Sequence, residues 1–330
     1  MKNISEIWDK GKKLLGSEYA ILGGAMSWVS EHNLVAAISN AGGFGVIACG
    51  SMNPEQLDKE IKATKALTSK PFGVNLITMH PDMDKLIQVC KDNDVSHVVL
   101  AGGLPKSYMI ETLKSHNIKV IAFAPALVIA KKLIKMGVDG IVIEGMEAGG
   151  HIGPVSTIVL AQEILPVLKD EIPIFVAGGI GRGEAVSQFL KMGAAGCQLG
   201  TMFVCCDESI AHDKFKDLFI RSNARDTVTS IQLDPNFTVI PVRAIANKGT
   251  EEFIVAQRKA IDEYNSGKLS KEEAQLMIER YWAGALRKAV IDGDVEYGSV
   301  MAGQSVGMVL SKKPVAEIIN QLVDQTYKSY

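Results

Sequence analysis

Eight short apolar segments recur along the first two-thirds of this 330-residue chain, and they constrain its fold more than any other feature. Each is closed by glycine, proline or a polar residue, as buried strands of a parallel sheet are. Segments with helical periodicity separate them, so that successive strands lie about 20 to 33 residues apart, the size of a strand–helix unit. Eight such units in succession predict a (β/α)8 barrel, or TIM barrel, of the α/β class. The predicted strands are Ala20–Met26, Phe44–Gly50, Phe72–Ile77, His97–Gly102, Val120–Ala124, Gly140–Glu144, Ile174–Gly178 and Gly196–Phe203.

An open doubly wound sheet is the alternative, because it also alternates strands and helices. That fold normally has five or six strands and a glycine-rich dinucleotide turn after the first. The first turn here, Gly23–Trp28, lacks that glycine spacing, so the barrel is favoured.

The alternation ends near Arg221, and later segments have helical periodicity. These later helices are expected at Thr250–Tyr264, Lys271–Ala289 and Pro314–Tyr327. We therefore expect a barrel at residues 1–222, a smaller, mostly helical region at 223–300 that covers the substrate, and a C-terminal segment at 301–330 that returns to the barrel. Within the helical region, Tyr281 and Trp282 either line an apolar channel or pack the helices onto the barrel.

Composition narrows the classes of partner and compartment. A formal net charge of -2 argues against nucleic acid or an anionic membrane surface as the main partner. No apolar stretch reaches the ~18 residues that a membrane-spanning helix needs. The five cysteines are odd in number and lack metal-ligand spacing, which indicates reduced thiols and a cytoplasmic location. No acidic cluster or set of histidines has metal-ligand spacing either, so no metal is expected.

Glycine turns are expected at the carboxyl ends of the seventh and eighth predicted strands. The first contains Gly178 and Gly179 after Ala177, and the second contains Gly200 and Thr201. In barrels these two loops often bind phosphate through backbone N–H groups, which only glycine lets an anion approach closely. The alternative is that the glycines simply permit tight turns. Because both turns occur in the right pair of units, we interpret them as a phosphate site.

A third glycine-rich loop, Glu144–Gly153, follows the sixth predicted strand and contains Gly149, Gly150 and His151. This placement is at the carboxyl end of a strand, where barrel enzymes carry their catalytic groups. Imidazole titrates near neutral pH, which suits proton transfer. We therefore predict that His151 is the catalytic acid–base residue. The other histidines are interpreted as solvated or structural: His32, His80, His97, His116 and His212.

Taken together, these segments resemble the FMN-dependent nitronate monooxygenase (2-nitropropane dioxygenase) family, which includes the flavin-dependent type II enoyl-acyl-carrier-protein reductases. The resemblance extends over nearly the whole chain. Its motifs are Gly23–Val29, Ser39–Gly45, Lys70–Asn75, the His151 loop, Ala177–Ile180, Gly200–Thr201, Gly293–Val295 and Gly298–Gln304.

The resemblance implies a bound FMN and assigns residues to it. Ala25 stands where the family usually has glycine. The implied ring-lining residues are Gly24, Ala25 and Met26, with Asn75 bonded to the ring, Glu144 to the ribityl chain, and Gln304 closing the site. Gly149 and Gly150 are placed beside the cofactor, and Ala177, Gly178, Gly179, Gly200 and Thr201 at its phosphate.

Two activities remain open within this family. The motifs Met146–Gly153 and Ser299–Gln304 look more like those of the enoyl reductases, which would use NAD(P)H and a small-molecule or acyl-carrier-protein-borne substrate. Known nitronate oxidisers carry a Cys-Ala-Gly-His variant and a lysine near the fifth strand, where this chain has Ala122–Pro125. A non-catalytic flavin-binding protein is a more remote alternative, and a homodimer is one of the assemblies left open.

Overall fold

The computed structural model describes residues 6–330, and its centre is an eight-stranded parallel sheet in the order β1-β9-β8-β6-β5-β4-β3-β2. The ends of this sheet are joined, because Leu22 of β1 forms a parallel bridge with Phe44, two residues before β2. The sheet is therefore a closed barrel, which confirms the predicted (β/α)8 fold. Its strands are β1 (Ile21–Gly23), β2 (Val46–Ala48), β3 (Gly73–Ile77), β4 (His97–Ala101), β5 (Lys119–Phe123), β6 (Gly140–Glu144), β8 (Ile174–Ala177) and β9 (Gly196–Leu199).

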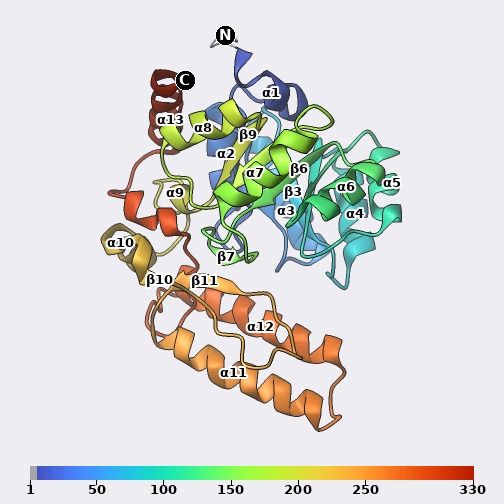
Figure 1. The fold of residues 1–330 in the computed structure, drawn as a ribbon, viewed down its shortest axis with the longest axis vertical. Coiled ribbons are helices and arrows are strands. Elements are labelled where there is room, and N and C mark those ends of the chain that lie inside the picture. The colour runs from blue at the N-terminus through green and yellow to red at the C-terminus, as the bar shows by residue number, and fades with distance from the viewer. Residues whose placement is uncertain (1–5) are drawn as a thin grey trace.

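Helices follow the strands and surround the barrel (Figure 1). Their inward faces are buried against strands that are themselves almost entirely buried, forming one large apolar core. Local sequence sets their ends. Helix α3, for example, begins at Pro54, and its N-cap residue Asn53 forms a reciprocal capping box with Gln56 in the first turn. The surrounding helices are α2 (His32–Asn40), α3 (Pro54–Leu67), α4 (Met83–Asp92), α5 (Ser107–Lys114), α6 (Leu127–Lys135), α7 (Thr157–Leu168) and α8 (Gly183–Met192). Two further helices, α9 (Thr201–Val204) and α10 (Asp213–Arg221), follow β9.

The last predicted strand, Gly196–Phe203, is too long. Strand β9 ends at Leu199, and Thr201 already begins helix α9. The apolar character of Met202–Val204 belongs to a buried helical turn, which periodicity cannot distinguish from strand over so few residues. This places Gly200 at the strand-to-helix junction rather than inside a strand.

The amino-terminal end of the barrel is covered by helix α1 (Asp9–Leu15), which ends at Gly16 in the left-handed conformation. The carbonyl oxygen of Leu14 accepts from Lys119 Nζ at 2.7 Å and lies 2.8 Å from His97 Nε2. Both partners stand at the first residue of their strands. His97 is therefore a buried structural residue that anchors α1.

Burial at this position predicts an acid-sensitive stability. Desolvation lowers the pKa of His97 to about 4, so between that pH and 6.5 the unfolded chain binds a proton that the folded chain does not. Stability is therefore complete above the unfolded pKa and declines as pH falls. From pH 7 to pH 5 the parent should lose about 2 kcal/mol more unfolding free energy than His97→Gln. Urea unfolding at both pH values measures this; parallel losses in the two proteins would contradict it.

After the barrel, the chain forms two short strands and two long helices. The strands β10 (Thr227–Thr229) and β11 (Val242–Ile245) are antiparallel, and β11 also pairs with β7 (Gly150–His151) from the loop after β6. The expectation of turns and helices alone thus missed a small three-stranded sheet, because strands this short give little periodic signal. The helices are α11 (Lys248–Asn265) and α12 (Lys271–Val290), and a 3-10 turn, η2 (Ala224–Asp226), precedes β10.

Helices α11 and α12 lie beyond the small sheet, at the side of the barrel that bears β7 (Figure 1). They enclose a second apolar core in which Trp282 stacks on Phe253 with ring centroids 4.1 Å apart. Tyr281 also contacts both rings, and its hydroxyl donates to the Gly249 carbonyl. Of the two interpretations of Tyr281 and Trp282, the structure shows the packing one, although within the helical region rather than against the barrel.

The C-terminal segment returns to the barrel. Ile245 donates its N–H to Val300, and Met301 forms a bridge with Ala244. A 3-10 turn, η3 (Gln304–Met308), follows, and α13 (Val315–Ser329) then packs against α8 and α2. No helix among residues 6–330 combines the length and apolar character needed to cross a bilayer.

Candidate active site at the carboxyl ends of the strands

The predicted site residues lie on five barrel strands, or immediately after them, and on two segments that reach the same end of the barrel. Gly24–Met26 follow β1, Asn75 is in β3, and Glu144 ends β6. Ala177 ends β8 and is followed by Gly178 and Gly179, while Gly200 and Thr201 follow β9. On the two other segments, Gly149 directly precedes β7 (Gly150–His151), and Gln304 begins η3.

Gly24 and Gly200 face each other where β1 and β9 end. The Gly24 N–H donates to Leu199 O at 2.8 Å, and a Cβ built on Gly24 would lie 3.5 Å from the Gly200 Cα. A Cβ on Gly200 would meet only the Met26 side chain, at an ordinary 3.4 Å. Protein packing therefore does not demand glycine at these two positions. The close approach of a ligand to the backbone would explain why both residues are glycine.

The loop after β1 is held by Ser30, whose hydroxyl donates to Gly24 O at 2.9 Å and accepts from Met26 N at 3.0 Å. Ser30 is buried, whereas Ala25 and Met26 are only partly buried. The loop thus presents these two residues on a backbone fixed from behind.

The turn after β8 has a different need for glycine. Gly178 and Gly179 have φ of +102° and +71°, which L side chains rarely adopt. A Cβ on Gly178 would lie 2.9 Å from Gly145 O, and one on Gly179 would lie 2.8 Å from the Glu147 Cβ. Tight turning and packing alone therefore account for these two glycines. Their proposed contact with phosphate stays a prediction.

Two polar side chains in the barrel mouth keep hydrogen-bonding capacity. Asn75 is buried and donates from Nδ2 to Val99 O at 3.0 Å, which orients its amide while the Oδ1 remains an acceptor. Glu144 is partly buried, and desolvation raises the pKa of its carboxyl group to about 8. A carboxyl group in this position is stabilised by a ligand hydroxyl or another donor.

The His151 loop is fixed by the small sheet. His151 pairs with Val242 of β11, and Ile152 donates to Pro241 O at 2.9 Å. The buried Arg243 side chain donates from Nε to Met146 O at 2.8 Å and from a terminal nitrogen to Thr227 O at 3.1 Å. Strand β11 therefore holds both ends of the turn that presents the imidazole.

The side chain of His151 is 41% exposed, and its Nε2 lies 3.0 Å from Glu279 Oε2 of α12. Sequence analysis did not find Glu279, because nothing in a single sequence indicates that these two residues meet. The imidazole thus lies between the barrel loop and the helical region.

The return segment closes against this loop. Gln304 donates its N–H to Glu147 O at 2.9 Å, and Gly303 donates to the Thr201 hydroxyl oxygen at 3.0 Å. A Cβ on Gly149 would lie 2.5 Å from Gly303 N, so glycine is required for this close approach. The Thr201 hydroxyl uses its oxygen here and keeps its hydrogen available for an anion.

These features fit FMN. Gly24 and Gly200 leave open backbone at one side of the mouth, Thr201 offers a hydroxyl donor there, and Glu144 and Asn75 offer partners for a polyol and a polar ring. Gln198, buried on β9 with its Nε2 3.6 Å from a Cβ built on Gly24, is a further polar side chain beside this region that sequence analysis did not select.

A cluster of Glu31, His32 and Glu60 also escaped the sequence analysis, which found no metal spacing. Their ligand atoms lie within 4.8 Å of one another. His32 Nδ1 is 2.9 Å from Glu60 Oε2, and Glu31 caps α2 by accepting from two backbone N–H groups. The acidic oxygens are thus already used by protein donors, and the cluster secures the start of α2.

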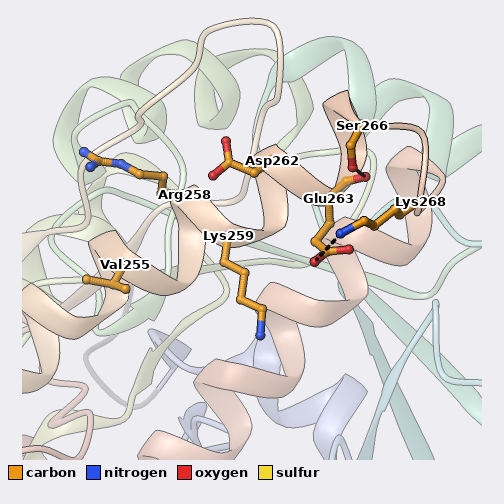
Figure 2. A pocket seen from close by; sticks show the side chains of 7 residues that line it. All are labelled: Val255, Arg258, Lys259, Asp262, Glu263, Ser266 and Lys268. Atoms are coloured by element: carbon orange, nitrogen blue, oxygen red, sulfur yellow. Dashed lines mark hydrogen bonds and ion pairs between the residues drawn. The ribbon is translucent and has the colours of Figure 1, made fainter.

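A hollow of about 430 Å³ lies on the outer face of α11 and the turn that follows it (Figure 2). It is lined by Val255, Arg258, Lys259, Asp262, Glu263, Ser266 and Lys268, and Glu263 pairs with Lys268 at 3.5 Å. None of the predicted site residues lines this hollow. It is therefore separate from the candidate active site.

A closed (β/α)8 barrel with glycine turns and an exposed imidazole at the carboxyl ends of its strands has the form of a barrel oxidoreductase. The chain belongs to the nitronate monooxygenase family, whose model matches residues 10–86 and 80–325. The solved structure of FabK from Thermotoga maritima is similar, with a TM-score of 0.83 and 34% identity, covering 96% of each chain.

Two curated relatives also match nearly the whole chain. A "(3aS,4S,5R,7aS)-5-hydroxy-7a-methyl-1-oxo-octahydro-1H-indene-4-carboxyl-CoA dehydrogenase" of Rhodococcus jostii (strain RHA1) is 28% identical, over 96% of this chain and 95% of its own. A "Probable nitronate monooxygenase" of Staphylococcus aureus (strain JH9) is 28% identical, over 97% of this chain and 98% of its own. The chain is therefore similar in full length to members with different activities.

Proposed function

We propose that this oxidoreductase is an FMN-dependent enoyl thioester reductase that uses NAD(P)H, with an acyl-carrier-protein-borne or small-molecule enoyl substrate. The observation that carries this proposal is the imidazole of His151, presented by the loop after β6 and anchored to β11. The likeness to FabK, an enoyl-acyl-carrier-protein reductase, supports the reaction, and a relative that acts on a CoA thioester supports the substrate class.

Each group would have a separate task. When bound, FMN would take a hydride from NAD(P)H and return it to the β-carbon of the enoyl group. His151 would give a proton to the α-carbon, and Asn75, Glu144, Gly24, Gly200 and Thr201 would hold the cofactor. Residues 223–300 would cover the substrate, which excludes water from the reacting carbons.

Nitronate oxidation by O2 is the second candidate. The name of the family model and the Staphylococcus aureus relative favour it. His151 would then remove a proton from a neutral nitroalkane. The carboxyl end of β5 and the two residues after it, Ala122–Pro125, lack the lysine expected of known nitronate oxidisers, and Lys119 lies at the opposite end of the strand. We therefore place this activity second.

We expect the protein to bind one FMN non-covalently and to reveal its reductant in an anaerobic mixing experiment. If the proposal is correct, NADH or NADPH bleaches the flavin absorbance, and a subsequent trans-2-enoyl-CoA or enoyl-acyl-carrier protein restores it. If only a nitronate bleaches it, the second candidate is correct. A colourless protein that takes up no FMN on reconstitution would contradict both.

Cellular setting and assembly belong to the same proposal. We infer a cytoplasmic enzyme, because all five cysteines are free, buried thiols of the kind that reducing compartments maintain. Nucleic acid and membrane are not proposed as partners. A homodimer is one assembly that size-exclusion chromatography with light scattering would test.

A further inference from the structure

We propose that Glu279 of helix α12 is a positioning residue that sets the orientation and the proton-bearing nitrogen of His151. This inference rests on the proposed function only in taking His151 as the acid–base group. It adds a residue outside the barrel, from the helical region, to the catalytic apparatus.

The first support is the contact itself. Glu279 Oε2 lies 3.0 Å from His151 Nε2, and both side chains are partly exposed, at 31% and 41%. A carboxylate only accepts, so it repels the lone pair of an unprotonated ring nitrogen at this distance. In the proposed arrangement Nε2 carries a hydrogen toward Glu279, and Nδ1 is the atom that exchanges a proton with substrate.

The second support is how firmly the two partners are placed. The His151 backbone is paired with Val242 of β11, so the ring can vary only by its side-chain rotation. In many active sites the side chain that transfers the proton is itself oriented by a further group. Glu279 would be that group for His151. Glu279 is the acidic side chain that contacts the ring, and its helix begins with a capping box between Ser270 and Glu273.

The third support is that α12 is fastened to the barrel along the same stripe. Glu279, Ala283 and Arg287 recur every four residues and share one helix face. Trp28, in the loop after β1, donates from Nε1 to Ala283 O at 3.2 Å, and the Arg287 guanidinium lies 5.8 Å from its ring centroid. Trp28 holds a positive φ of 66°, a strained conformation for a bulky residue.

This stripe therefore connects two loops of the candidate site. Its Ala283 and Arg287 end contacts the loop that carries Gly24–Met26, and its Glu279 end contacts His151. The arrangement makes the orientation of the acid–base group depend on α12 being seated on the barrel. A partly exposed pair contributes little to stability, so its removal should alter the reaction rather than the fold.

The test compares Glu279→Gln with Glu272→Gln, an exposed glutamate on the same helix. The protein is used loaded with FMN, and anaerobic stopped flow follows reduction by NAD(P)H and reoxidation by crotonyl-CoA separately. Glu279→Gln should slow reoxidation about 10- to 100-fold at saturating substrate, with flavin content and reduction by NAD(P)H unchanged, since general acid–base catalysis as a whole is worth ~10²–10⁴-fold. Glu272→Gln should match the parent.

Two further measurements separate positioning from a structural role. Combined with His151→Ala, Glu279→Gln should cause no additional loss, because the residue acts through the imidazole. The imidazole 15N signals of His151 are those that disappear in His151→Ala. Their shifts should report hydrogen on Nε2 in the parent and a changed ratio of the Nε2-H to the Nδ1-H form in Glu279→Gln.

Parent-rate reoxidation in Glu279→Gln, or a full additional loss in the double variant, would overturn the role of Glu279 while His151→Ala remains slow. Parent-rate reoxidation in His151→Ala would instead overturn the proposed function.

Discussion

Gly200→Glu should abolish FMN binding while the barrel stays folded. A Cβ here meets only the Met26 side chain at an ordinary distance, so the fold tolerates the substitution. The added carboxylate would lie next to Thr201, in the turn that is expected to receive the phosphate. Two unit charges about 4 Å apart repel by about 4 kcal/mol near a protein surface, which weakens binding about 10³-fold. Flavin fluorescence titration of the apoprotein measures this, with circular dichroism to establish folding.

The matched control is Gly200→Gln, which has nearly the same size without the charge. It should retain more affinity for FMN than Gly200→Glu, because steric exclusion remains but repulsion does not. Gly179→Asp should also lose FMN, but its positive φ and the 2.8 Å approach to Glu147 strain the turn as well. If a folded Gly200→Glu protein bound FMN at the parent affinity, the assignment of the phosphate to this turn would be wrong.

The barrel could be predicted because its strands are buried on both sides and read as apolar runs at regular intervals. The small sheet could not. Its strand β7 has only two residues, Gly150 and His151, and its β10 begins and ends with threonine. Neither segment is long enough to show a period of two, so their pairing depends on tertiary contacts with β11.

The candidate site divides in the same way. Glycine turns and a lone histidine at strand ends are visible locally, because their backbone geometry and chemistry are properties of a few adjacent residues. Glu279 and Trp28 are not, because each gains its role from a partner far along the chain: Glu279 contacts His151, and Trp28 contacts Ala283. Whether Gly178 serves phosphate or only packing is likewise invisible in a sequence, and its close neighbours Gly145 and Thr157 account for it without a ligand.

The largest kinetic effect is expected from His151→Ala. The variant should retain FMN, because most residues assigned to the cofactor lie on other strands. The Gly149–Gly150 backbone beside it is held by pairing with β11 rather than by the imidazole. Its fold should also persist, since the ring is partly exposed and its pair with Glu279 adds little stability. The proton-dependent step should slow about 10²–10⁴-fold, the usual contribution of general acid–base catalysis.

The same variant distinguishes the two chemistries. In an enoyl reductase, NAD(P)H should still bleach the flavin at the parent rate, and the loss should be confined to the step with the enoyl thioester, where the α-carbon needs its proton. In a nitronate oxidiser, turnover of neutral nitroalkane should fall while the pre-ionised nitronate, which needs no base, is oxidised as in the parent. Stopped-flow absorbance with each substrate records both patterns. Parent rates on every substrate would make His151 a structural residue of the β7–β11 pair. The proton would then have to come from another group in the barrel mouth. Glu144 is a titratable side chain at that end of the barrel, and its pKa is raised to about 8.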